Sequence, residues 1–453
     1  MQTFAKVLCC LVAFTVPVDL AAIVQETSRV VVGPNIRVGG DLTAPYVEPM
    51  VAVNPVDPDN LVGVSMKFDS AGLMVVALAS RDGGRAWLES PIPACRFDPW
   101  VAFLPTGMVL LSCQQGETVQ VFRSGDGGAT WSEPTQVSGD SMEYDHPTLA
   151  VDPTDGARRG TAYVVSGHSA QSSSGSYSHL APAVATSLDG GRTFSAQVRL
   201  QSTNVWSMPS SPVVLSDGTL GFTINDFAVD AGSAGGFIVL KTGRMWWATS
   251  TDGGRTLSMP HLIAEVEEMS RWGGVAVDRS DGPFRDRLYA TVDDFREGSG
   301  GVFVYHSADR GETWSAAIRV NRPDTVGQVR RLPAVAVNPR GEVLVAWFDP
   351  LGEPGRTCWR LMASASVDGG ESFLSPVSVA EVAFCNDQPG NVVAPGVVFR
   401  TPDTFDVGER WPAGGDYFGL AAHPDGSFRI LWADSRSGVF QLWTASIYVQ
   451  GQG

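Results

Sequence analysis

Carboxylate and aromatic side chains stand directly before several short apolar runs, at the place where a strand would begin. The runs are "MVAV", "WVAF", "TLAV", "GVAV" and "GLAA". The residues are Glu48, Asp98, Asp145, His146, Trp272, Asp416 and Tyr417. Two neighbouring carboxylates can act as general acid and base, and a tyrosine becomes a nucleophile when a carboxylate takes its proton. A structural role stays open for Asp145 and His146, because an aspartate at a strand entry also bonds its own backbone.

Four arginines offer the matching basic chemistry. Arg271, Arg330 and Arg331 lie in the same entry segments, and Arg436 follows the apolar run that ends at Asp434. A guanidinium binds a carboxylate through two parallel hydrogen bonds, so converging arginines would form a clamp for an anionic substrate. We therefore expect all four to be substrate-binding residues.

These side chains need a scaffold, and the chain repeats a motif that indicates one. The pattern Ser-x-Asp-x-Gly, usually followed by Thr and an aromatic residue, occurs six times at near-regular intervals, as in "SGDGGATW". Its aspartates are Asp82, Asp126, Asp189, Asp252, Asp309 and Asp368. The carboxylate can accept backbone N–H groups across a reversal, and the glycine supplies a positive φ. These six segments, here called the aspartate turns, therefore mark a repeated supersecondary unit, and their aspartates are expected to be structural.

Each unit reads as four antiparallel strands. In the second, strands are expected at 98–105, 108–113, 118–124 and 132–139. The entry to the first strand of a unit can be counted seven times along the chain, and the last unit supplies only three strands. The segment 33–40 has the pattern of an outer strand, so we expect it to complete that unit and remove two open edges. The sequence thus predicts an all-β fold, a propeller of seven four-stranded blades, with six blades as the alternative.

Composition sets limits on function. The 453 residues carry a net charge of −16, which argues against nucleic acid as a partner. Residues 1–22 have a lysine, an apolar run and then small residues, the order of a secretory signal peptide, and leave 23–453 as one domain. No later run is long enough to span a membrane. Four cysteines remain in an exported chain, and we expect Cys95 to pair with Cys113 and Cys358 with Cys385, although three connectivities exist.

The aspartate turns on a repeated four-stranded unit resemble the Asp-box, or BNR-repeat, proteins of the sialidase superfamily. The resemblance covers nearly the whole chain after residue 22 and extends to non-catalytic members. Sialidases of that family have six blades, three arginines that hold the substrate carboxylate, a Tyr–Glu nucleophile and an aspartate as acid/base. By position, Tyr417 matches the nucleophile and Asp69 the acid/base. The Arg-x-Pro element of that family is absent, and Glu48 stands near the place of its arginine. Val214 and Asn225 stand where the family has a glutamate and an arginine.

The resemblance implies a secreted glycoside hydrolase of the exo-α-sialidase type, extracellular or periplasmic, that acts on the terminal sugars of glycans. Two alternatives stay open: a non-catalytic propeller that binds a glycan or protein, and a glycan-cleaving enzyme that uses two carboxylates. No cofactor is expected; calcium stays open, because an aspartate-rich site offers oxygen ligands. We expect a monomer.

Overall fold

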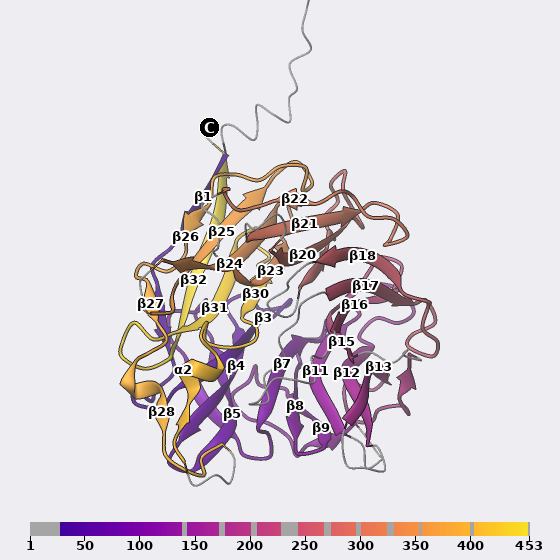
Figure 1. The fold of residues 1–453 in the computed structure, drawn as a ribbon. Helices are drawn as coiled ribbons and strands as arrows, with labels where there is room; N and C mark the ends of the chain where they lie inside the picture. Colours follow the sequence, from indigo (N-terminus) through magenta and orange to yellow (C-terminus); the bar gives the residue numbers. More distant parts are fainter. Residues whose placement is uncertain are drawn as a thin grey trace, which may run out of the picture.

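The computed structural model describes residues 28–137, 143–171, 177–200, 206–227, 243–266, 273–295, 300–323, 330–352, 356–398 and 403–451. These residues form a ring of seven four-stranded blades with almost no helix (Figure 1). The sequence-based prediction of a seven-bladed all-β propeller is confirmed. The predicted signal peptide lies outside the described residues.

Each blade runs from an inner first strand to an outer fourth strand. Blade 1 comprises β3 (Tyr46–Val53), β4 (Leu61–Asp69), β5 (Gly72–Ser80) and β6 (Leu88–Ile92), and blade 2 β7 (Phe97–Phe103), β8 (Val109–Gln115), β9 (Thr118–Ser124) and β10 (Thr135–Gln136). Blade 3 comprises β11 (Glu143–Val151), β12 (Ala162–Gln171), β13 (Tyr177–Ser187) and β14 (Val198–Arg199), and blade 4 β15 (Trp206–Val214), β16 (Leu220–Phe227), β17 (Gly243–Ser250) and β18 (His261–Val266). Blade 5 comprises β19 (Val275–Val277), β20 (Leu288–Asp294), β21 (Gly301–Ser307) and β22 (Ile318–Arg319), and blade 6 β23 (Arg331–Val337), β24 (Val343–Leu351), β25 (Cys358–Ser366) and β26 (Val377–Ser378).

Blade 7 is built from both ends of the chain. Strands β30 (Gly419–Ala422), β31 (Phe428–Asp434) and β32 (Gln441–Gly451) come from the C-terminal part, while β1 (Ser28–Val32) and β2 (Ile36–Val38) pair with β32. Ile36 lies opposite Thr444 and Arg37 opposite Trp443. Figure 1 shows β1 and β32 side by side. This is the predicted closure, and it leaves β32 paired on both sides.

An insertion separates blade 6 from blade 7. It holds β27 (Phe384–Cys385), η2 (Pro389–Asn391), β28 (Val392–Val393), β29 (Phe405–Asp406) and the short helix α2 (Val407–Arg410). Asp406 caps α2 and accepts from the N–H groups of Gly408 and Glu409 at 2.8 and 3.1 Å. The insertion leads directly into the entry segment of blade 7.

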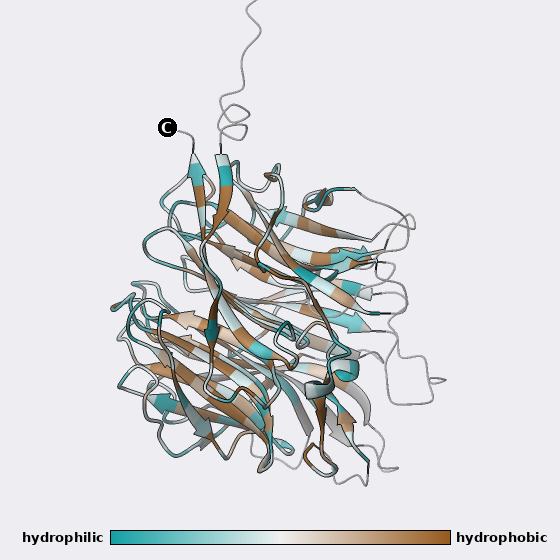
Figure 2. Ribbon diagram, turned by 90° about the vertical axis from the view of Figure 1, so that its left-hand side faces the viewer, coloured by the Kyte–Doolittle hydropathy of each residue, from teal (hydrophilic) through white to brown (hydrophobic). Residues whose placement is uncertain are grey.

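The core lies between blades. Buried residues of one blade pack against those of the next; one cluster, for example, joins Val62 and Val64 of blade 1 to Val109 and Leu111 of blade 2. Figure 2 shows the apolar residues concentrated in the strands and the hydrophilic ones in many of the connecting turns. Each blade has apolar side chains on both faces of its sheet, and this suits the packing of one sheet on the next.

The aspartate turns have the expected geometry. In blade 2, Ser124 Oγ and Thr130 N donate to Asp126 Oδ1 at 2.7 and 2.9 Å, and Thr130 Oγ1 donates to Oδ2 at 2.6 Å. Gly127 and Gly128 have φ values of 64° and 92°, which favour glycine. Burial opposes ionisation of Asp126, but the hydrogen bonds from Thr130 and Ser124 outweigh it and lower its pKa to about 2.

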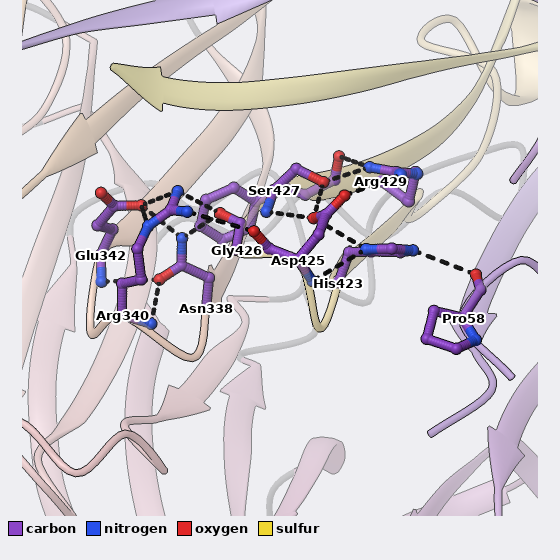
Figure 3. Close-up of polar contacts among 10 residues, drawn as sticks. Pro58, Asn338, Arg340, Glu342, His423, Asp425, Gly426, Ser427 and Arg429 are labelled. Atoms are coloured by element: carbon purple, nitrogen blue, oxygen red, sulfur yellow. Dashed lines mark hydrogen bonds and ion pairs between the residues drawn. The ribbon is translucent and has the colours of Figure 1, made fainter. Parts of the chain in front are cut away.

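Blade 7 has no aspartate turn at the equivalent place, and a different network closes its seams (Figure 3). On the blade 6 side, Asn338 Nδ2 and Arg340 Nη2 donate to Gly426 O at 2.6 and 2.7 Å. On the blade 1 side, His423 Nε2 lies 3.1 Å from Pro58 O, and its Nδ1 lies 2.8 Å from an oxygen of Asp425. The β30–β31 hairpin thus contacts both neighbouring blades, through side chains of the β23–β24 hairpin on one side and through its own His423 on the other.

Both predicted disulfides form. Cys95 pairs with Cys113 and Cys358 with Cys385. The second disulfide ties the start of β25 to the insertion. Within the described ranges, no helix has the length and apolar character of a membrane span.

Candidate functional site

A repeated bulge in the first strands shapes the centre of the ring. In five blades the pairing register of the first strand shifts at a residue that directly precedes a proline. These residues have positive φ values between 46° and 57°, and they are Glu48, Asp98, His146, Ser211 and Leu332. A residue before proline normally prefers an extended backbone, so recurrence in five blades marks a built feature that re-aims these side chains. Tyr417 occupies the same place in the sequence of blade 7.

A central cavity of about 150 Å³ lies among these positions. All seven blades contribute to its wall, which places it on the propeller axis. His146, Ser211, Leu332 and Tyr417 line it. We refer to it as the axial cavity.

Three aromatic rings meet at this cavity. The Tyr417 ring lies 5.2 Å from the His146 ring and 5.6 Å from the Trp100 ring, centroid to centroid. The Tyr417 hydroxyl donates to the backbone oxygen of Pro99 at 3.3 Å. The site therefore offers flat apolar surface beside polar groups, the combination that small-ligand sites use.

Carboxylates surround Tyr417. Burial raises its pKa well above the usual value, and the negative charges of Glu48, Asp98, Asp416 and Asp145 raise it further. Tyr417 therefore keeps its proton and acts as a hydrogen-bond donor. Asp98 also lies 3.9 Å from His146 Nδ1.

One guanidinium enters this acidic group from the insertion. Arg410, the last residue of α2, lies 3.2 Å from an oxygen of Asp416. Burial opposes the charge of Arg410, but the charges and hydrogen bonds of Asp416, with Glu48 and Asp98, outweigh burial and raise its pKa. Arg410 thus fixes Asp416 in place and offsets part of the negative charge.

Asp69 lies apart from this group. Its Oδ1 accepts from Ala71 N at 2.8 Å, and its Oδ2 lies 3.8 Å from Lys67 Nζ, which also binds Glu89 and Asp41. Asp69 is not among the described residues that line the axial cavity. Its expected role as acid/base gains no support from this position.

The described arginine candidates each have their own contacts. Arg330 is buried and binds Asp349 Oδ1 at 2.6 Å and Gly300 O at 2.8 Å. The guanidinium of Arg331 lies 5.7 Å from the Trp359 ring centroid. Arg330 and Arg331 thus have separate contacts in blades 5 and 6. The candidates Arg271 and Trp272 lie outside the described residues.

Arg436 belongs to the blade closure. Its Nη2 lies 2.5 Å from an oxygen of the fully buried Asp434, and its Nη1 donates to Asn35 Oδ1 at 3.0 Å. The guanidinium also lies 4.3 Å from the Trp443 ring centroid. These contacts join blade 7 to the segment between β1 and β2, so Arg436 holds the ring together at its seam.

Two kinds of site residue escaped the sequence analysis. Trp100, Ser211 and Leu332 lie at or beside the bulges. The proline that recurs at aligned strand entries was the sequence signal that could have identified them. Arg410 lies in the insertion, outside the repeat, so the repeat pattern could not predict its role. Among the described residues, no cluster of three or more His, Cys, Asp or Glu side chains is arranged to hold a metal ion.

Neither a protein-family model nor a curated protein matches the sequence. Similar solved structures include a protein of unknown function from Dyadobacter fermentans, at 12% identity and a TM-score of 0.48, covering 94% of this chain and 100% of that one. An α-L-arabinofuranosidase from Fusarium graminearum has 15% identity and a TM-score of 0.49 over 74% of this chain and 97% of its own. The leech intramolecular trans-sialidase has 10% identity and a TM-score of 0.40, with 93% and 94% covered.

Proposed function

We propose that the protein is a secreted glycoside hydrolase that binds a terminal, uncharged sugar in the axial cavity. The observation that carries this proposal is the charge of the site: Glu48, Asp98, Asp145 and Asp416 act on Tyr417, while one guanidinium, that of Arg410, enters the described group. A sugar carboxylate would meet repulsion there, whereas sugar hydroxyls are good donors to carboxylates.

The same groups supply the chemistry of glycosidic bond cleavage. Hydrolysis needs one carboxyl group to protonate the leaving oxygen and a second to activate water or attack the sugar. We assign these two tasks to the group formed by Glu48, Asp98 and Asp416. Trp100 offers a ring face for the apolar side of the sugar, and Tyr417 holds its hydroxyl proton toward the Pro99 carbonyl.

The sialidase alternative rests on the aspartate turns and on the place of Tyr417 in the sequence. It requires an arginine clamp, and Arg330 and Arg436 are each bound to an aspartate of their own blade. The non-catalytic alternative keeps the same cavity and uses it for binding.

Chromogenic glycosides separate the three proposals. The panel contains neutral pentosides and hexosides and one sialoside, and the purified protein is tested alone and with a chelator. We expect turnover of a neutral glycoside, and about 10²- to 10⁴-fold lower kcat for the carboxylate variant that removes the acid or base. The variants are Glu48→Gln, Asp98→Asn and Asp416→Asn.

Asp69→Asn is the matched control, because Asp69 is a carboxylate at a strand end and is not among the carboxylates whose charges act on Tyr417. Unchanged turnover by Asp69→Asn supports the axial carboxylates, and a large loss in this variant alone, measured on the sialoside, supports the sialidase alternative. Saturable binding of glycans without turnover supports the non-catalytic propeller.

A further inference from the structure

A second cavity lies between blades 3 and 4, at the opposite end of the blades from the strand entries. Its volume is about 710 Å³, and its wall includes the aspartate turns of both blades. Ser187, the first residue of the aspartate turn in blade 3, pairs with Ala162. Ala162 lies opposite Val151, the last residue of β11, so this turn lies at the far end of the blade from the strand entry. We call this space the seam cavity. It shares no lining residue with the axial cavity.

The repeat supplies an internal comparison for this cavity. The segment 151–163, "VDPTDGARRGTAY", has the same length and pattern as 277–289, "VDRSDGPFRDRLY". The first leads into β12 at the seam of blades 3 and 4, and the second leads into β20 at the seam of blades 5 and 6. Residues in the same place of the two segments can therefore be compared directly.

In the seam of blades 5 and 6, the compared positions carry an aromatic ring and an ion pair. Arg287 Nη1 donates to Gly369 O at 2.7 Å and binds Glu371 Oε1 at 2.9 Å. Phe284 covers Gly369 so closely that a Cβ there would lie 2.6 Å from its ring. An aromatic ring and one ion pair thus close this seam.

The seam of blades 3 and 4 replaces all three side chains. Arg158 stands in place of Phe284, Thr161 in place of Arg287, and Arg255 in place of Glu371. All three replacements line the seam cavity. The exchange replaces an aromatic ring and an ion pair by two guanidinium groups, and Arg158 covers Gly253 so that a Cβ there would lie 3.1 Å from its Nε.

Among the described residues, neither Arg158 nor Arg255 forms an ion pair with a carboxylate. Asp189 lines the cavity, but Ser187 and Thr193 donate to its two oxygens. Arg255 donates through Nη1 to the backbone oxygen of Asp252 at 2.9 Å, and that contact leaves most of its five donors for a ligand. On a chain of net charge −16, two guanidinium groups without an ion pair in one cavity can offer paired donors to an anion.

The remaining wall fits a sugar that carries the anion. Phe194 provides a ring face, and Thr161 and Ser195 provide hydroxyls beside it. The buried Tyr163 lies behind Gly253, but Tyr289 is buried in the same way in the other seam, so these phenols belong to the repeat. The charge exchange is what distinguishes the seam of blades 3 and 4.

We propose that the seam cavity binds an acidic saccharide, with Arg158 and Arg255 holding its carboxylate or sulfate group and Phe194 contacting the sugar ring. This site would retain the protein on an anionic glycan while the axial cavity faces away from it. The proposal does not depend on hydrolysis in the axial cavity.

Isothermal titration with three probes of equal length tests this site: trigalacturonate for a carboxylate, a sulfated galactan trisaccharide for a sulfate, and neutral galactotriose. We expect the whole protein to bind at least one anionic probe about tenfold or more tightly than galactotriose, and to lose affinity as salt rises. The anionic probe that binds more tightly identifies the preferred group.

The variants exploit the internal comparison. Thr161→Arg with Arg255→Glu recreates the ion pair of the other seam, and we expect it to keep the thermal midpoint while weakening anion binding about tenfold or more. Arg255→Gln, a change at an exposed position, should weaken binding in the same direction. Arg159→Gln is the matched control. Arg159 follows Arg158 in the sequence, is exposed and paired with Asp155, and does not line the seam cavity.

Three outcomes would overturn the proposal. They are equal affinity for galactotriose and the anionic probes, no binding of any probe, and unchanged anion binding by both Arg255 variants. Loss of anion binding with normal turnover of neutral glycosides would separate this site from the axial cavity.

Discussion

Replacing Arg436 by alanine should destabilise the whole ring. The change removes the partner of Asp434, which is fully buried and bound at 2.5 Å, and also the hydrogen bond to Asn35. Removing one member of a buried ion pair leaves an uncompensated charge and costs about 3–5 kcal/mol. Because Arg436 links blade 7 to the N-terminal strands, the loss affects the closure.

The expected shift in melting temperature follows from chain length. Unfolding entropy near the midpoint is about 2.1 cal/mol/K per residue, so the 453-residue chain gives roughly 1 kcal/mol/K. A loss of about 3–5 kcal/mol then lowers Tm by about 3–5 °C. Differential scanning calorimetry resolves a change of this size.

Arg356→Ala is the matched control. Arg356 also forms a two-point ion pair, with Asp387 at 2.6 and 2.7 Å, but their side chains are 47% and 46% exposed. An exposed pair contributes about 0–1 kcal/mol, so Tm should change by about 1 °C or less. If Arg436→Ala melts like the wild type and instead loses affinity for a sialoside, the structural role of Arg436 is refuted and the clamp is favoured.

Three further predictions concern the fold. Removing residues 28–40 should lower Tm and promote association, because β32 loses its paired edge; sedimentation beside a protein that starts at Ser28 checks this, and an unchanged monomer would contradict it. Burial opposes ionisation of Asp126 and Asp189, but hydrogen bonds outweigh it and hold their pKa at about 2 against a usual 3.8, so their stabilisation is complete above about pH 5 and is lost as pH falls toward 2; urea unfolding should show that fall, smaller in Asp126→Asn. Peptide mass spectrometry without reduction should find Cys95 linked to Cys113 and Cys358 linked to Cys385, and a Cys95–Cys358 peptide would contradict the structure.

The fold could be predicted from the sequence because its signals are local and repeated. Each aspartate turn carries its own hydrogen-bond partners within a few residues, as Asp126 does with Ser124 and Thr130. The closure could also be predicted, because three strands in the last unit leave one place for the segment around Ile36. Local chemistry and strand counting were sufficient for both.

The site was predictable in part. The strand entries placed His146 and Tyr417 at the centre of the ring, and the structure brings them to the axial cavity. The strand ends were poorer guides. Asp69 contacts Lys67, which is held by the distant Glu89, and Arg436 binds the distant Asn35. Arg410 comes from an insertion with no repeat, so its contact with Asp416 could not be predicted.

The most direct test of the central claim is the rate of sugar release from one neutral glycoside and one sialoside by the wild type and by Asp416→Asn. Asp416 lines the axial cavity, and asparagine is nearly isosteric and can still accept a hydrogen bond from Arg410, so the variant should fold normally and lose activity at the cavity. We predict release of the neutral sugar by the wild type, a loss of about two orders of magnitude or more in the variant, and no release of sialic acid. Efficient release of sialic acid by the wild type, with Asp416→Asn fully active, would contradict the account.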